Sequence, residues 1–166
     1  MQEVPRSVEL ALGPSKPVSL RIPALDRESE LIETGLRDDN RLEVPPGDEG
    51  SPASWYNGSS TPGEAGAAVL LGHVNSLTDH SGVFYDLKTL KKGNTISVTR
   101  EDGATAIFEV YKVEKYVKAE FPTKAVYYPV AGAELRLITC DGYDKPNRLY
   151  RDNLVVYAEL VEVDNA

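Results

Sequence analysis

Three residues with the chemistry needed for acyl transfer occur in this sequence: Cys140, His73 and Arg151. A thiolate is the reactive nucleophile, but an unperturbed thiol with a pKa of about 8.5 is only slightly ionised at neutral pH. An imidazole with a pKa of about 6.5 can accept or return that proton. A guanidinium offers fixed donors and permanent charge to the oxyanion that forms when a carbonyl is attacked. The three side chains therefore form a complete set for peptide-bond chemistry.

Each of these residues also has an ordinary structural interpretation. Cys140 is the only cysteine, which excludes an intramolecular disulfide, and a lone cysteine is more often a buried core residue than a nucleophile. His73 could be a core histidine on an apolar strand, and Arg151 could form a surface ion pair with Asp152. The second histidine, His80, lies in a turn-like segment and is interpreted as solvated. Two histidines and one cysteine without ligand spacing predict no metal site.

The elements that must position these residues are short strands with turns between them. Strands are predicted over 18–25, 31–36, 67–74, 95–100, 104–117, 134–140 and 153–163. His73 ends one strand, Cys140 ends another, and Arg151 lies at the start of the last. If residues 141–150 form a loop between antiparallel neighbours, Cys140 and Arg151 come side by side. Closing seven or eight strands removes exposed edges, so we expect a mainly β, closed barrel with short helices in its loops.

Four further signals lie between these strands. Residues 41–66 form a long connection rich in glycine and proline, which Trp55-Tyr56 is expected to pin to the core. Asn57-Gly58-Ser59 matches a glycosylation acceptor but is interpreted as a turn. A helical turn is expected within 83–90, because Phe84, Leu87 and Leu90 have helical spacing. Asp102-Gly103 predicts a hairpin turn.

Length and composition bound the class of protein. The 166 residues suffice for one domain. We expect a flexible segment over 1–17, which is either a tether or the cut end of a longer protein, a catalytic domain over 18–163 and a tail over 164–166. The formal net charge of −8 argues against nucleic-acid binding. No apolar stretch is long enough to span a bilayer. If Met1 is a start introduced by cloning, a membrane anchor would precede it.

The local sequence strings resemble the sortase family. The family signature is a strand ending in Thr-Leu-x-Thr-Cys, a histidine on an earlier strand and an arginine on the strand after the cysteine. Here LRLITC ends at Cys140, LGHV contains His73, and Arg136-Leu137 stand at the Thr-Leu positions. The resemblance covers about residues 18–163 and is strongest to class F sortases of actinobacteria, with class D and E members sharing parts of it. It is carried further by RIPAL, LEVPP, WY, GHVNS, VFYDL, FPTKAVY and YRDNLVVYA.

The resemblance implies an eight-stranded barrel and a two-step cysteine transpeptidase. Cys140 would cleave a Leu-Pro-x-Thr-Gly-like sorting signal between threonine and glycine through a thioacyl intermediate, with His73 as general acid and base and Arg151 at the oxyanion. An amine, from a cell-wall precursor or a pilin lysine, would then accept the acyl group. Thr139 and Asn75 are the expected substrate-binding residues, and the loops 75–82 and 116–131 would line the groove.

The resemblance also sets expectations about cofactors and location. We expect no cofactor, and no calcium activation, because Glu120 is the only acid between residues 118 and 130. The native protein would be a monomer anchored at the extracellular face of the bacterial plasma membrane. It would attach surface proteins to the cell wall.

Two alternatives from other classes remain open at this stage. An L,D-transpeptidase is also a β-rich cell-wall cysteine enzyme, but its arginine comes two residues after the cysteine, whereas Asp141-Gly142 follow Cys140 here. A non-catalytic β-barrel that binds peptide or glycan would not need the thiol.

Overall fold

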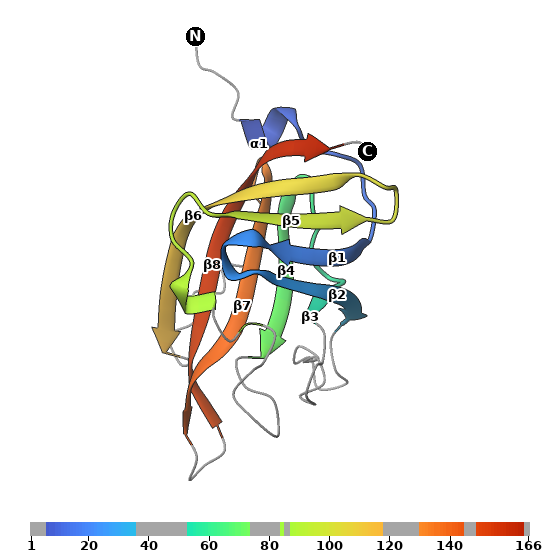
Figure 1. The fold of residues 1–166 in the computed structure, drawn as a ribbon. Coiled ribbons are helices and arrows are strands. Elements are labelled where there is room, and N and C mark those ends of the chain that lie inside the picture. Colours follow the sequence, from blue (N-terminus) through green and yellow to red (C-terminus); the bar gives the residue numbers. More distant parts are fainter. Residues whose placement is uncertain are drawn as a thin grey trace.

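The computed structural model describes residues 6–35, 53–73, 84, 87–117, 130–144 and 149–164. Eight strands close into a barrel in the order β1-β2-β3-β4-β7-β8-β6-β5, with β5 pairing back onto β1 (Figure 1). The strands are β1 (Pro17–Ile22), β2 (Arg27–Thr34), β3 (Ala53–Tyr56), β4 (Gly66–His73), β5 (Thr95–Arg100), β6 (Thr105–Val117), β7 (Ala133–Asp144) and β8 (Leu149–Asp164). The expected closed, eight-stranded, mainly β barrel is confirmed.

Helical structure is short in the described part of the chain. It consists of the α-helix α1 (Arg6–Glu9) and the 3-10 helices η1 (Pro23–Leu25) and η2 (Leu87–Thr89). Phe84, Leu87 and Leu90 are all buried, which confirms the helical turn predicted from their spacing. Pro23 begins η1 directly after β1, because its fixed φ suits the first helical position and it cannot donate a ladder hydrogen bond.

The interior of the barrel is filled by alternate residues of the strands. Leu70 of β4, Leu137 of β7 and Val156 of β8 lie at paired positions and belong to the main core. Their neighbours along each strand belong to a second buried cluster on the outer face of the same three strands. This outer cluster consists of Val69, Leu71, Ile138, Val155 and Tyr157. Because successive side chains alternate between the faces of a strand, these strands are apolar on both faces. This explains the continuous apolar run that ends at His73.

Most predicted strands are confirmed, and β5 coincides with the predicted 95–100. The segment 41–66, read as one long connection, contains a strand that the sequence reading missed, β3. Trp55 of this strand is buried and donates its Nε1–H to the Ser60 carbonyl oxygen over 3.0 Å, so its anchoring role is confirmed. The turn at Asn57-Gly58 is also confirmed, because the Ser59 N–H donates to the Tyr56 carbonyl oxygen.

The expected loop over 141–150 is wrong in its extent. Strand β7 continues to Asp144 and β8 begins at Leu149, with Asp141 opposite Asp152 and Tyr143 opposite Tyr150. The polar, glycine-containing composition suggested a loop, but an antiparallel ribbon satisfies its own backbone hydrogen bonds whatever its side chains are. The predicted antiparallel neighbourhood of the two strands is correct.

The segment before β1 has described contacts with the barrel. Leu10 and Ala11 pack against the main core, and the Leu12 N–H donates to the Gly63 carbonyl oxygen over 2.7 Å. The domain boundaries at 17 and 163 stay predictions.

Two isoleucines test the assignment of the barrel interior. Ile22 is fully buried, whereas Ile32 on the neighbouring strand is 36% exposed. We expect Ile22→Ala to lower the free energy of unfolding by about 2–5 kcal/mol, because it leaves a cavity in the core. Ile32→Ala should change it by about 0.5 kcal/mol or less. Urea unfolding of both variants decides the matter, and equal losses would contradict the assignment.

Candidate active site

The register of the parallel pair β4–β7 brings two of the three candidate residues together. Gly66 lies opposite Ala133 and the pairing continues without a shift to His73 opposite Cys140. Parallel ladders are evenly spaced, so one offset of 67 residues, from 73 to 140, holds along the whole pair. Two residues far apart in the sequence are therefore backbone neighbours on the adjacent strands β4 and β7 (Figure 1), where β4 ends and β7 continues to Asp144.

The antiparallel pair β7–β8 brings in the third candidate. Cys140 lies opposite Asn153, and Arg151 is two residues before Asn153 on the same strand, beyond the Asp141–Asp152 pair. Thr139 lies opposite Gly72 on one side and Leu154 on the other. For His73, Thr139, Cys140 and Arg151 the structure describes the backbone and not the side chains. Asn75 and His80, like the loops 75–82 and 118–129, lie outside the described residues.

A buried charged group lies on the outer face of β7, nearer to the start of the strand than Cys140. The Arg136 side chain is 2% exposed, and its Nη1 lies 2.7 Å from Glu134 Oε1. Its Cζ lies 4.7 Å above the centre of the Tyr157 ring, within the range of a cation–π contact. Within the described residues its Nε–H has no hydrogen-bond partner. The sequence analysis noted Arg136 only as a departure from the family signature. The alternation of Leu135, Arg136 and Leu137 could have shown that Arg136 lies on the outer face, because its two neighbours belong to the core.

A β-bulge adds a tyrosine to this group. The register of β6 against β8 shifts between Val110 and Lys112, so Tyr111 is the extra residue on its strand. A bulge redirects side chains, and the Tyr111 hydroxyl donates to Glu134 Oε1 over 2.5 Å, with its ring 6.1 Å from that of Tyr157. Burial first, and then the hydrogen bond to the Glu134 carboxylate, raise the pKa of Tyr111 well above its ordinary value. This hydroxyl therefore stays protonated and serves as a donor.

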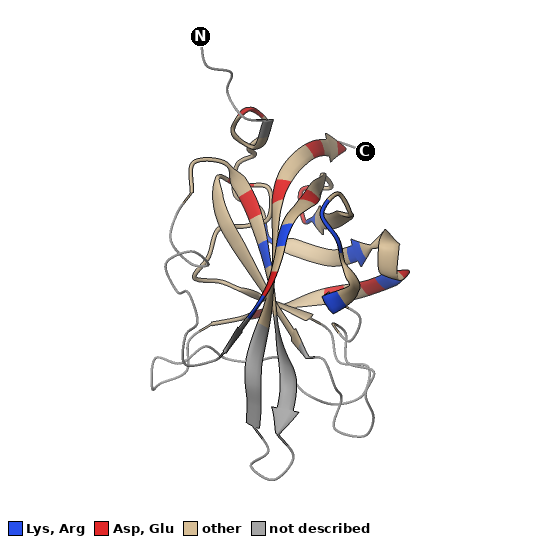
Figure 2. Ribbon diagram, turned by 90° about the vertical axis from the view of Figure 1, so that its left-hand side faces the viewer, with Lys and Arg blue, Asp and Glu red and all other residues tan. Residues whose placement is uncertain are grey.

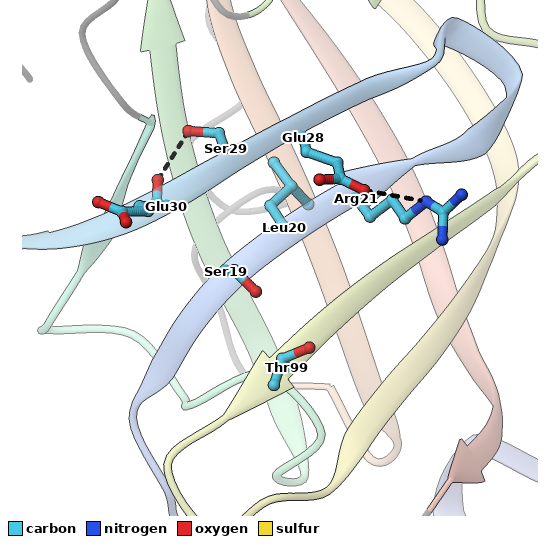
Figure 3. A pocket seen from close by; sticks show the side chains of 7 residues that line it. All are labelled: Ser19, Leu20, Arg21, Glu28, Ser29, Glu30 and Thr99. Atoms are coloured by element: carbon cyan, nitrogen blue, oxygen red, sulfur yellow. Dashed lines mark hydrogen bonds and ion pairs between the residues drawn. The ribbon is translucent and has the colours of Figure 1, made fainter.

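A surface hollow of about 410 Å³ lies elsewhere on the barrel (Figure 3). Its lining comes from β1, β2 and β5 and consists of Ser19, Leu20, Arg21, Glu28, Ser29, Glu30 and Thr99. Arg21 and Glu28 form an exposed ion pair over 3.5 Å, and the Ser29 hydroxyl donates to the Glu30 carbonyl oxygen. The lining contains no thiol or imidazole, so this hollow does not offer the chemistry of acyl transfer.

The described residues offer neither a metal-binding cluster nor a membrane-spanning helix. No three His, Cys, Asp or Glu residues gather there as a metal-binding group. In the same part of the chain, no helix has the length and apolar character needed to cross a bilayer. Basic and acidic residues are interspersed along the strands seen in Figure 2.

The sequence of the chain matches a known protein family. The sequence model of the Sortase domain family matches residues 20–161, which is most of the chain. The chain therefore belongs to the sortase family. This match favours the sortase interpretation over the L,D-transpeptidase alternative. No curated protein sequence matches the chain.

Solved structures of sortases share the fold. Sortase A from Corynebacterium diphtheriae is similar with a TM-score of 0.66 and 23% identity, covering 93% of this chain and 64% of that chain. Sortase C2 of Group B Streptococcus pilus island 1 gives 0.64 and 20%, covering 92% and 77%. A sortase D5 transpeptidase of Clostridium perfringens gives 0.62 and 19%, covering 88% and 79%. The chain thus spans 64% of the length of the corynebacterial sortase.

The raised pKa of Tyr111 predicts a pH dependence of stability. Above about pH 10, the ordinary pKa of tyrosine, the folded protein binds more protons at this site than the unfolded chain, so stability falls as the pH rises. We expect Tyr111→Phe to cost about 1.5 kcal/mol at pH 8, since a hydrogen bond to a charged acceptor is lost. The variant should also lose less stability than the parent between pH 8 and pH 10.5. Urea unfolding at both pH values measures this, and parallel losses would show that Tyr111 does not titrate as described.

Proposed function

We propose that this chain is a cysteine transpeptidase that acts on a sorting-signal peptide. The proposal names Cys140 as nucleophile, His73 as general acid and base, and Arg151 as the oxyanion donor. The observation that carries it is the backbone register, in which His73 and Cys140 are direct partners and Arg151 follows on the adjoining strand. Membership of the sortase family supports the same assignment.

Strand alternation supports a common face for the three residues. Leu71, Ile138 and Val155 form one row of the outer cluster across β4, β7 and β8. His73 and Cys140 come two residues after the first two members of this row. Asn153 comes two residues before Val155, the third member, and Arg151 comes two residues before Asn153. Positions two apart share a face of the sheet, so we propose that the catalytic set shares the outer face with this row.

The first half of the proposed reaction breaks the peptide bond. The Cys140 thiolate attacks the carbonyl carbon of the threonine in a Leu-Pro-x-Thr-Gly-like signal, and a carbon–sulfur bond forms. The guanidinium of Arg151 donates hydrogen bonds to the resulting oxyanion. As the carbon–nitrogen bond breaks, the His73 imidazolium gives its proton to the leaving glycine amine. A thioester to Cys140 remains, and His73 is neutral.

The second half transfers the acyl group. The acceptor amine attacks the thioester carbonyl, and neutral His73 takes its proton. The carbon–sulfur bond then breaks, which restores the thiolate and the imidazolium. The acceptor is an amine of a cell-wall precursor or a pilin lysine, and the product is a surface protein attached to the cell wall. Thr139 and Asn75 are proposed to contact the peptide, and no metal or other cofactor takes part.

We also propose a class within the sortase family, on the basis of the short sequence motifs. They favour class F over classes D and E. The catalytic domain is proposed to span 18–163, and the family match over 20–161 lies inside it. We propose a monomer held at the extracellular face of the plasma membrane of an actinobacterium by an N-terminal anchor.

A peptide assay tests the proposed activity. Incubation with a fluorogenic Leu-Pro-x-Thr-Gly peptide and an amine should give cleavage after threonine and a ligated product, both detected by mass. Cys140→Ala should abolish both. His73→Ala should lower the rate by about 10²–10⁴-fold through loss of proton transfer. Arg151→Ala should lower it by about 10²–10³-fold through loss of an oxyanion donor.

Ser19→Ala is the matched control, because Ser19 lines the hollow on β1, β2 and β5 and not the candidate site. Its rate should equal that of the parent. A Cys140→Ala protein that still cleaves at the parent rate would remove the thiol from the mechanism. Cleavage without ligation would indicate a hydrolase, and binding without cleavage by the parent would indicate a non-catalytic barrel.

A further inference from the structure

Residues 7–16, called the strap here, cross the end of the barrel opposite the candidate active site (Figure 1). The strap forms a parallel β-bridge between Leu12 and Glu64, just before β4 begins. The Ser15 N–H donates to Thr61 Oγ1 over 3.1 Å, and the Glu101 N–H donates to the Lys16 carbonyl oxygen over 2.9 Å. The second half of the strap is thus hydrogen-bonded to the barrel.

A buried arginine fixes the middle of the strap. The Arg100 side chain is 2% exposed, and its Nη2 donates to the Gly13 carbonyl oxygen over 2.6 Å. Its Nη1 donates to the Pro62 carbonyl oxygen over 3.1 Å, and its Nη2 forms an ion pair with Asp102 over 2.7 Å. One guanidinium therefore joins the strap, the segment before β4 and the β5–β6 turn. Hydrogen bonds to a charged donor are stronger than neutral ones.

The local backbone is shaped around this arginine. Gly63 has φ +98°, a conformation that favours glycine, and a Cβ there would lie 2.8 Å from Arg100 Nη1. The Ala104 N–H and then the Arg100 guanidinium hold the pKa of Asp102 below its usual range. Asp102 therefore stays ionised as the partner of the buried cation over the range in which the barrel is expected to work.

The N-terminal part of the strap reaches β7, the strand that carries Cys140. Helix α1 lies against β7 and β8. Ser7 is buried against Gly132, where a Cβ would lie only 2.3 Å from Ser7 Oγ. The Gly66 N–H, at the start of β4, donates to the Gly132 carbonyl oxygen over 2.9 Å. The strap thus contacts the chain just before β4 at Leu12 and just before β7 at Ser7.

We propose that the strap is a brace that holds the starting ends of β4 and β7 together, with Arg100 as its lock. In this role the strap positions His73 opposite Cys140 from the far end of the same strand pair. His73 follows Gly66 by seven positions, a length of about 23 Å at about 3.3 Å per residue. The effect on catalysis rests on the proposed transpeptidase function, whereas the bracing itself does not.

The physical reason lies in how parallel strands are joined. An antiparallel pair can be held in register by a tight turn, but a parallel pair needs a long connection. The chain between β4 and β7 passes through β5 and β6 on the other side of the barrel, so no short turn sets the register of β4 against β7. A segment that grips both starting ends adds a constraint to the side-chain packing of the pair. Arg100 is then a positioning residue, not a catalytic one.

Hydrogen exchange tests the lock. We expect Arg100→Met to lower the protection of the Leu12 and Ser15 amides by about 10-fold or more, since bonds to a charged donor are lost. Protection of the amides at the start of β4 and β7 should fall with it. Arg21→Met is the matched control, because Arg21 on the neighbouring strand is 64% exposed and paired with Glu28. It should leave all of these amides unchanged, and Arg100→Lys should restore part of the protection.

Kinetics test the positioning role. A misplacement of about 1 Å at a reacting atom can cost about 100-fold in rate, so Arg100→Met should lower kcat by about 10-fold or more. KM should be unchanged, because the described contacts of the strap lie near the starting ends of β4 and β7, whereas His73 lies at the other end of β4. The folded fraction of each variant is measured by urea unfolding under the assay conditions, so a loss of folded protein is not read as a loss of kcat.

Gly132→Ala is a second variant that leaves Arg100 intact and displaces α1 through the contact with Ser7. It should produce the same pattern, and it decides the matter if Arg100→Met does not fold. Unchanged protection of the strap in both variants would overturn the lock. Released strap amides with an unchanged kcat would overturn the positioning role. A parent without transpeptidase activity would refute the proposed function, and exchange alone would still decide whether the strap braces β4 and β7.

Discussion

The parallel register of β4 against β7 is the constraint on which the rest of this structure depends. Gly66 faces Ala133 at one end and His73 faces Cys140 at the other, without a shift between them. A slip by one residue would exchange the two faces of a strand. It would carry core residues outward and outer residues into the barrel at the same time. The packing that specifies the fold therefore also specifies which residues are neighbours at the candidate active site.

Side-chain fit and one buried charge specify this register, because the strands are buried on both faces. Leu70 and Leu137 meet in the barrel interior, and Leu71 and Ile138 meet in the outer cluster. Burial of each such side chain contributes about 1.5–3 kcal/mol. A slip by one residue would still bring apolar side chains to both faces of β4, but it would turn Arg136 of β7 away from Glu134 and Tyr157 and into the barrel interior. The outer cluster thus stabilises the strand pair and lies beside the proposed catalytic residues.

Two buried arginines in the described part of the chain lie where this packing meets polar groups. Arg100 is neutralised by Asp102 and hydrogen-bonded to two backbone carbonyls, and Arg136 is paired with Glu134 and covered by Tyr157. A buried charge is tolerated only when it is paired and hydrogen-bonded, and removing one partner is costly. Such groups favour one arrangement of the segments that they join. Arg100 does this at the strap, and Arg136 does it on the strand that carries Cys140.

The sequence by itself determined the class of fold, most strand positions and the three candidate catalytic residues, because alternation, turn residues and short motifs are local properties. It did not determine β3, the extension of β7 and β8 into the expected loop, or the roles of Arg100 and Arg136. Those depend on hydrogen bonds and burial between segments distant in the chain, such as Gly13 with Arg100. Only closure of the barrel decided that residues 73 and 140 are partners, since a parallel register is fixed by packing and not by any turn between the strands.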